Sequence, residues 1–392
     1  MTLDLVKVAE QLPLLVERLQ RERTERERRL ACALDRLRQA AASPERFEER
    51  VLSADCSWPL ALVRQGAIDG SYPAPEAPCN YAALAVDGSS IDVDRQEPID
   101  CYVLNFGWMA LRYGAGAVAE PGSGVTLEPT GGPLRFRDAD DPSRESAVAG
   151  NLLSVVRSVR ELAMLAELAD RYASDSHPLL ALVDGNLALW NLDKPDVPRS
   201  VADELKQGER GIVPALNRLR DLALAGRVLF SGYVSRTGAS NVVNSLRLLA
   251  CPLEERVVCR RCPGKETGTR PCDEAGLAKD AELMLHVLRP WERSAVFAQH
   301  RAHQAGTAER WYEAEGHEIL FFYLRVAEDE IARIELPAWM AEDADRLGRL
   351  HALLVAQARA GPDYPLALQE AHEQAVISTA DRRSFSALIA RE

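Results

Sequence analysis

Two segments of the chain share one pattern, an apolar run that ends in Asp-Gly, and this repetition constrains the fold more than any other feature. The first segment is AVDGS at residues 85–89, and the second is LVDGN at residues 182–186. A short continuous apolar run is typical of a buried strand. We therefore expect Asp87 and Asp184 at the carboxyl ends of two buried strands, with a sharp turn at the Gly-Ser-Ser that follows Asp87.

Two carboxylates on neighbouring strands have a chemical consequence. They repel each other unless a divalent cation lies between them. Oxygen ligands of this kind suit Mg²⁺ or Mn²⁺, and such an ion would activate water and stabilise charge on a phosphate. A single Asp-Gly after a strand is more often an ordinary turn, so only the pair of such sites indicates a metal site.

The remaining segments predict an α/β fold, because helices alternate with strands along the chain. Apolar residues at helical spacing predict helices over residues 145–172 and 201–225, and residues 101–113 suit one or two buried strands. Residues 51–80 are expected to be connecting structure, and residues 115–143 a hairpin or mobile loop. Further segments are expected to form helices at 241–250 and 274–288, and strands at RVLFSGYVS (227–235), HEILFFYLRV (317–326) and ARIELP (332–337).

The N-terminal region is expected to be a helical extension over residues 1–55, followed by the main domain over residues 80–392. Its segment RERTERERR has almost no apolar residue, and a helix that is polar all round is either solvated or docked on a partner. The net charge of −12 argues against a basic surface over the whole molecule, which non-specific DNA binding would favour. No apolar stretch is long enough to span a membrane and no signal peptide is evident, so we expect a cytoplasmic protein.

A cysteine-rich segment, residues 251–273, is expected to be an insertion in the main domain. Its cysteines follow the spacing Cys251-x7-Cys259-x2-Cys262-x9-Cys272. A CxxC pair places two thiolates within reach of one metal, and a second pair nearby would complete a structural Zn²⁺ site. Four thiolates also suit an iron–sulfur cluster, and a third possibility is that the cysteines bind no metal.

Several motifs, in their order along the chain, resemble those of bacterial proteins of the NurA family. The motifs are AVDGSS, RSVRELAMLAELA, LVDGNLALW, SGYVSRTGASNVVNSLR, FFYLRV, RIELPAW and YPLALQEAHEQAVI. They cover roughly residues 80–385, and the GYVSR and YPLALQEAHE segments are the most specific of them. The resemblance implies an RNase H-like core, with a mixed sheet flanked by helices.

The same resemblance implies a function. NurA proteins are DNA nucleases that use Mn²⁺ or Mg²⁺, form a homodimer and act with the hexameric ATPase HerA in DNA end resection. This predicts a metal-dependent deoxyribonuclease, an exonuclease or endonuclease or both, that acts in DNA repair or in antiviral defence. The alternatives are a non-catalytic RNase H-like adaptor of the ATPase and another RNase H-like nuclease. An adaptor would be expected to have lost some of the carboxylates that are present here.

The resemblance also assigns site residues. Asp87 and Asp184 match the two metal-binding aspartates of the family, and Glu161 matches a metal-binding glutamate on the helix before the second aspartate strand. Glu145 and Glu167 are alternatives to Glu161, because spacing alone does not fix the alignment.

Three further residues match family positions near the site. His372 matches a C-terminal histidine that would bind metal or position a water molecule, although a lone helical histidine often makes only a structural hydrogen bond. Tyr233 and Arg236 match positions at a strand end, where an arginine would hold a phosphate; the alternative is a surface arginine beside a packed tyrosine. One departure is Asn186, where the family usually has serine; it keeps a polar turn residue, so we expect activity to be retained.

Overall fold

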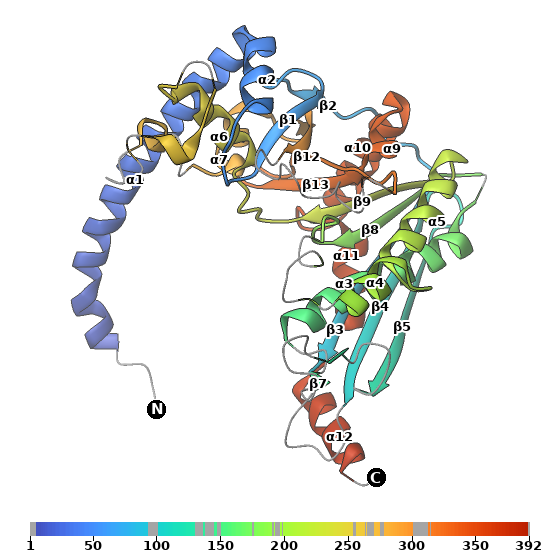
Figure 1. Ribbon diagram of the computed structural model, residues 1–392. Helices are drawn as coiled ribbons and strands as arrows, with labels where there is room; N and C mark the ends of the chain where they lie inside the picture. Colours follow the sequence, from blue (N-terminus) through green and yellow to red (C-terminus); the bar gives the residue numbers. More distant parts are fainter. Residues whose placement is uncertain are drawn as a thin grey trace. The chain divides into compact units, whose positions relative to one another are not determined.

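The structure is a computed structural model of the chain (Figure 1). It describes residues 5–92, 101–129, 136–137, 145–146, 150–174, 176–189, 192, 197, 199–253, 256–262, 264, 270–274, 278–300, 313 and 315–390. Among these residues, no helix has both the length and the apolar character needed to cross a membrane.

Eleven strands are joined by hydrogen bonds into one mixed sheet, and helices flank it. The α/β class is therefore confirmed, and the architecture is consistent with an RNase H-like core. The chain divides into two compact units, each of which is described by itself. Unit 1 comprises residues 1–73, 236–308 and 321–332, and unit 2 comprises residues 74–235, 309–320 and 333–392.

The sheet of unit 2 is built around β3 (Tyr81–Ile91), which pairs antiparallel with β4 (Cys101–Tyr113) and parallel with β8 (Leu179–Asp184). On the far side of β4 lies β5 (Val118–Pro129), and on the far side of β8 lies β9 (Val228–Val234). The strand β13 (Ile331–Pro337) pairs antiparallel with β9. Two short strands, β6 (Phe136–Arg137) and β7 (Glu145–Ser146), pair only with each other.

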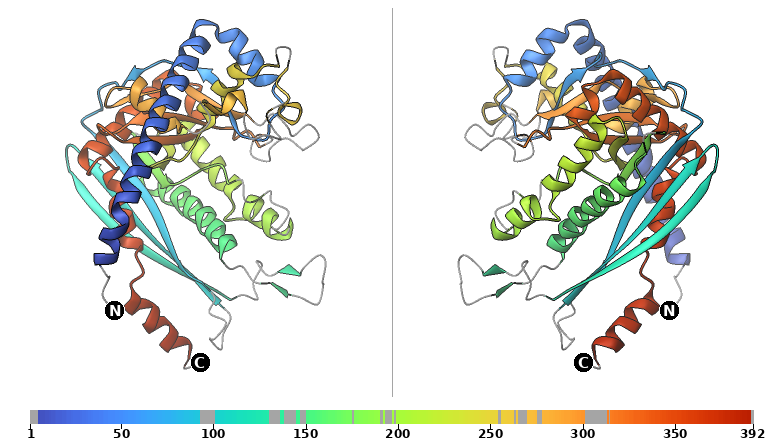
Figure 2. Two further views of the ribbon diagram at one scale, coloured as in Figure 1. Left: turned by 90° about the vertical axis from the view of Figure 1, so that its left-hand side faces the viewer. Right: turned by 90° about the vertical axis from the view of Figure 1, so that its right-hand side faces the viewer.

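Two helices of unit 2 cover opposite faces of β3 (Figure 2). The helix α3 (Asn151–Tyr172) packs on β3 and β8, and α11 (Leu366–Ala375) packs on β3 and β4. The predicted apolar stripe of α3 is confirmed, because Val155, Val159 and Leu162 are all buried. Burial of such a stripe, rather than helix propensity, provides most of the stability of a helix in a folded protein.

Other helices of unit 2 complete the layers around the sheet. They are α4 (Arg199–Gln207), α5 (Ile212–Leu224), α9 (Ala338–Ala341), α10 (Ala344–Ala360) and α12 (Thr379–Ile389). The helix α5 packs against α3 and β9, and α10 packs against α11 and β9. The sheet is thereby covered on both faces, which explains why β3 and β8 are nearly continuous apolar runs.

Unit 1 begins with two helices, α1 (Leu5–Ala42) and α2 (Pro44–Leu52), which confirms the predicted helical N-terminus. Ala33, Leu37 and Phe47 of these helices are buried in its core. Its strands are β1 (Leu60–Gln65), β2 (Tyr72–Pro73), β10 (Glu292–Arg293), β11 (Val296–His300) and β12 (Ile319–Arg325). Its other helices are α6 (Asn241–Arg247), α7 (Asp280–Val287) and the short 3-10 helices η2 (Leu248–Ala250), η3 (Cys259–Arg261) and η4 (Pro271–Glu274).

Two expectations from the sequence were wrong in detail. Residues 51–80 are not only connecting structure, because they include β1 and β2. The predicted turn after Asp87 is absent, since β3 continues in register with β4 as far as the pair Ile91 and Val103. The long partner strand supplies hydrogen bonds throughout this stretch, which outweighs the turn tendency of Gly-Ser-Ser. The hairpin expected within residues 115–143 is found in part, because β5 pairs antiparallel with β4 across the short turn before Val118. The residues beyond Pro129 lie largely outside the described part of the chain.

Candidate active site

Strand register places Asp87 and Asp184 beside each other. β3 and β8 run parallel, and their last paired residues are Val86 and Val183, so each aspartate is the next residue along its strand. The two strands differ beyond this point: β8 ends at Asp184, whereas β3 continues. The expectation that the sheet brings these two carboxylates together is thus met by backbone pairing alone.

The helix α11 reaches the sheet over Gly107, which is paired across the ladder with Asp87. A Cβ atom at position 107 would clash with backbone atoms of α11, so only glycine permits this close approach. The last residue of α11 is also fixed to the sheet: the carbonyl of Ala375 accepts hydrogen bonds from Asn105, over 2.8 Å, and from Ser89. These contacts determine where α11 presents its side chains.

His372 of α11 contacts Asp87. Its Nδ1 atom lies 2.6 Å from Asp87 Oδ2, while 66% of the histidine side chain is exposed, against 17% of that of Asp87. The ring therefore contacts the largely buried Asp87 carboxylate at one nitrogen and is exposed to solvent elsewhere. A histidine in this position can hold or move a proton at the site.

Glu161 enters the site from α3 on the other face of β3. Its carboxylate lies over Gly88, where a Cβ atom would clash with Oε1. Arg157, one turn earlier on α3, donates from Nη1 to the carbonyl of Gly88 over 2.7 Å and places Nε 3.4 Å from Glu161 Oε1. The absence of a side chain at Gly88 therefore leaves the space above the strand that the Glu161 carboxylate occupies.

Electrostatics within this group of acids are unfavourable. Glu161 is buried, with 5% of the residue exposed, and its Oε1 has no hydrogen bond. Burial raises the pKa of Glu161 to about 8; Arg157 opposes the shift, and the charges of Asp87 and Asp184 add to it. Loss of solvation and the charge of Asp87 likewise raise the pKa of Asp184. A buried carboxyl group whose pKa is raised in this way, and on which two further acids act, is a candidate functional group.

Tyr364 was not foreseen as a member of the site. Its hydroxyl forms a hydrogen bond with Asp184, and burial together with the charge of Asp184 raises the pKa of the phenol. Its ring meets that of Tyr233 edge-on, with centroids 5.2 Å apart. Tyr233 is fully buried and thus supports Tyr364, which is the tyrosine in contact with a carboxylate.

The turn after Asp184 is held by a buried ion pair. Gly185 has a φ of +100°, which favours glycine. Beyond it, Glu335 of β13 accepts from the backbone nitrogen of Leu187 over 2.9 Å, and Arg333 Nε lies 2.9 Å from the same carboxylate. The second Asp-Gly is therefore a true turn, unlike the first.

The other candidates from the sequence are placed as follows. Glu167 is exposed, and Glu145 belongs to β7, so Glu161 is the glutamate that the structure brings to Asp87 and Asp184. Asn186 is exposed in the turn after β8. Arg236 is exposed in unit 1, with a φ of +47°.

The side chains of this site fit a hard divalent cation. They offer carboxylate oxygens, one of them buried and without a hydrogen bond, and a histidine nitrogen, the donor types that Mn²⁺ accepts. Among the described residues, however, no three His, Cys, Asp or Glu side chains are already grouped closely enough to hold a metal ion. Asp87, Glu161 and Asp184 are neighbours that interact electrostatically.

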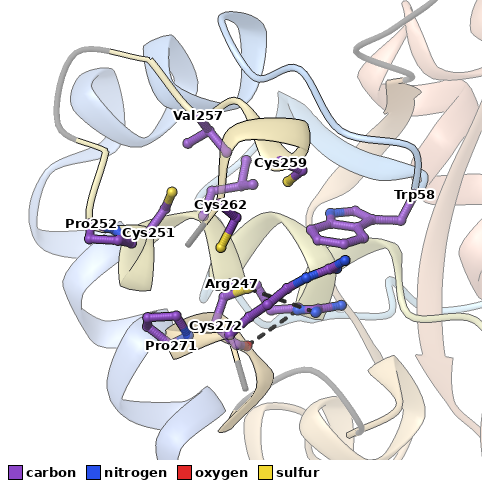
Figure 3. A pocket seen from close by; sticks show the side chains of 11 residues that line it. Trp58, Arg247, Cys251, Pro252, Val257, Cys259, Cys262, Pro271 and Cys272 are labelled. Atoms are coloured by element: carbon purple, nitrogen blue, oxygen red, sulfur yellow. Dashed lines mark hydrogen bonds between the residues drawn. The ribbon is translucent and has the colours of Figure 1, made fainter. Parts of the chain in front are cut away.

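The four clustered cysteines lie elsewhere, in unit 1. Cys251, Cys259, Cys262 and Cys272 all line one small pocket, together with Trp58 and the side chains around it (Figure 3). All four are unpaired thiols.

A mixed sheet with carboxylates on adjacent strands is consistent with an RNase H-like nuclease. A family model described as the NurA domain matches residues 81–377. The chain therefore belongs to the NurA family, a family of nucleases, as its motifs indicated. Among curated proteins, none matches the chain.

Proposed function

We propose that this protein is a metal-dependent deoxyribonuclease that hydrolyses phosphodiester bonds at the group formed by Asp87, Glu161 and Asp184. The observation that carries the proposal is the buried Glu161 oxygen without a hydrogen bond, beside two further carboxylates. Because a buried carboxylate oxygen that makes no hydrogen bond is costly, Glu161 is a candidate metal ligand, although Arg157 lies 3.4 Å from that oxygen. The third carboxylate also favours an enzyme over a non-catalytic adaptor.

In this proposal Asp87, Glu161 and Asp184 hold Mn²⁺ or Mg²⁺. When bound, the ion would supply an activated water and stabilise the negative charge that develops on the phosphate. Tyr364 orients the Asp184 carboxylate through its hydrogen bond. Arg157 holds the β3 backbone beneath Glu161 and offsets part of the negative charge.

His372 is proposed to move the proton in this reaction, either from the attacking water or to the leaving oxygen. Its ring is anchored to Asp87 at one nitrogen and open to solvent elsewhere. A positioned general acid or base of this kind typically contributes a factor of about 10² to 10⁴ in rate. Arg236, with its exposed guanidinium, is proposed to hold a phosphate of the DNA; Tyr233 would act indirectly, through Tyr364.

The proposed setting is DNA end processing or anti-phage defence, as a homodimer that acts with a HerA-type hexameric ATPase. Family membership supports this, and the charge of the chain adds a physical reason. An acidic protein, here with a net charge of −12, captures DNA weakly by electrostatics alone. A translocating partner that feeds DNA to the site would raise its local concentration.

The direct test uses the purified protein and labelled linear DNA, both duplex and single-stranded, with Mn²⁺, with Mg²⁺ or with EDTA. We expect cleavage with a divalent cation and none in EDTA. Equal cleavage in EDTA would contradict a metal-dependent mechanism. Binding of the ATPase by a protein that cleaves no DNA under any of these conditions would favour the adaptor.

A second experiment tests the partnership. The cognate ATPase with ATP is expected to stimulate degradation of duplex DNA strongly, and ATP without the ATPase to have no effect. Light scattering is expected to give the mass of a dimer for the isolated nuclease. A strictly monomeric protein, or full processive degradation in the absence of the ATPase, would contradict this part of the proposal.

A further inference from the structure

The pocket shown in Figure 3 is not used by the proposed nuclease reaction. It gathers thiols from three separate short elements of unit 1. Cys251 follows η2, Cys259 opens η3, Cys262 follows η3, and Cys272 lies in η4. Cys251 and Cys272 are separated in sequence by the whole cysteine-rich segment, yet they line the same pocket. From this convergence we infer that Cys251, Cys259, Cys262 and Cys272 bind one structural Zn²⁺ ion.

The local structure explains why an ion is needed here. Among the described residues of the segment, the four cysteines lie in or beside short 3-10 helices, and η3 has no buried residue. Val257 packs in the apolar core of unit 1, and polar contacts to the backbone also hold the segment. Arg50 of α2 donates to the carbonyl oxygens of Leu248 and Cys251 over 2.8 and 2.7 Å, and Asp55 exchanges backbone hydrogen bonds with Val257 and Cys259. A metal ion would cross-link these short elements.

The charge around the pocket suits a thiolate site. Each thiol that binds Zn²⁺ releases its proton, so four thiolates and one Zn²⁺ carry two net negative charges. Arg247 and Arg270 line the same pocket, and both stack over Trp58, with guanidinium carbons 4.2 and 5.7 Å from the ring centroid. Arg247 also donates to Cys272 Sγ over 3.8 Å and pairs with Asp273. These two cations offset the charge of the site.

Cys56 lies next to this group but is assigned a different role. Its thiol lies within hydrogen-bond reach of the Cys259 sulfur and of the carbonyl of Trp58, 3.7 Å away, and its single proton can serve one of them at a time. It does not line the pocket. Among the described residues, no three cysteine, histidine or acidic side chains are already close enough together to hold a metal ion. Binding of Zn²⁺ must therefore move the four pocket thiols closer to one another. In the bound state, Cys56 donates a hydrogen bond to the Cys259 sulfur.

The test is the zinc content of full-length reduced protein purified without chelator, which should be about one ion per chain. Cys259→Ser and Cys272→Ser should each reduce it to near zero. Cys56→Ser and the exposed Cys79→Ser are matched controls that should keep the ion. Asp184→Asn should also keep it, which separates this site from the proposed nuclease site.

A second measurement does not depend on how the variants fold. In the wild-type protein, a thiol reagent should react with the four pocket cysteines only after a strong chelator has removed zinc, and added Zn²⁺ should restore their protection. Unprotected thiols together with no tight zinc binding on titration would overturn the inference. Iron with visible absorption would overturn the identity of the metal, and loss of zinc in Cys56→Ser would overturn the ligand set.

Discussion

Gly88 of β3 lies beneath the carboxylate of Glu161, and a Cβ atom at position 88 would occupy the space of its Oε1 atom. The strand is extended at this point, and no unusual φ demands glycine. Glycine is favoured at position 88 for a steric reason, because the Glu161 side chain of α3 occupies the space that a Cβ atom would take. This relationship makes the position of the third carboxylate testable without replacing any acid.

Gly88→Ala should displace Glu161 and reduce DNA cleavage by at least about tenfold, a loss of roughly 1.4 kcal/mol of transition-state stabilisation. Folding should persist, because the clashing atom is the end of a flexible side chain. The matched control is Gly348→Ala, where the nearest atom, in Pro75, lies 3.4 Å from the added carbon, an ordinary contact. If Gly88→Ala cleaves DNA as fast as the wild-type protein, Glu161 does not act from the position described.

Replacing Glu161 itself gives a sharper contrast. Glu161→Gln should reduce cleavage by roughly 10² or more, because an amide is a poor ligand for a hard divalent cation. The same change at Glu167, an exposed residue of the same helix, should have almost no effect. In chelator near neutral pH, Glu161→Gln should be no less stable than the wild-type protein, since a buried carboxyl group with a pKa of about 8 is largely protonated and the amide changes little charge. Loss of cleavage in Glu167→Gln but not in Glu161→Gln would show that the wrong glutamate was chosen.

His372→Gln should reduce the maximal rate by roughly 10² or more while DNA binding and folding are retained. The reason is that the histidine side chain is largely exposed and its one described contact is with Asp87. The exposed His286 of α7 provides the control, and His286→Gln should leave the rate unchanged. If His372→Gln cleaved DNA at the wild-type rate across the pH range, His372 would have no role in proton transfer.

The sequence predicted the pairing of Asp87 with Asp184 because both follow buried apolar strands, a signal that is local. The choice of Glu161 stays a prediction from the family motif; in the structure Glu161 lies within the buried stripe of α3, whereas Glu167 is exposed. The continuation of β3 beyond Asp87 was missed because Gly-Ser-Ser has turn character, and only the pairing with β4 overrides it.

Other parts of the site depend on contacts between distant segments. Gly107 carries no local signal of function, and it is required because α11 packs directly against β4. Tyr364 opens the YPLALQEAHE motif, but its role depends on a loop that brings its hydroxyl to Asp184. The short strands β1 and β11 were also missed, because runs of five or six residues are ambiguous without their partners.

His317 provides a pH-dependent test of the fold of unit 2. It is fully buried, its Nδ1 accepts from Trp339 Nε1 over 3.2 Å, and its Nε2 lies 3.1 Å from Asn217 Oδ1. Burial and the charge of Arg220 lower the pKa of His317 to about 4. The unfolded chain therefore binds a proton that the folded protein does not, and stability falls as the pH drops from about 6.5 to about 4, by at most about 3 kcal/mol.

Chemical denaturation at several pH values measures this dependence. The free energy of unfolding of His317→Gln should fall less steeply between pH 6.5 and 4 than that of the wild-type protein, even if the variant is less stable throughout. The exposed control His286→Gln should keep the wild-type slope. An unchanged slope in His317→Gln would mean that folding does not lower the pKa of this histidine.

The most direct test of the proposed active site is cleavage of linear DNA in Mn²⁺ by Asp184→Asn, compared with Asp170→Asn. Asp170 lies on α3 in an exposed ion pair with Arg218, 3.1 Å apart, and such pairs contribute little to stability. We predict that Asp184→Asn stays folded and loses cleavage, and that Asp170→Asn cleaves like the wild-type protein. Cleavage by folded Asp184→Asn at a rate near that of the wild-type protein would contradict the proposed active site.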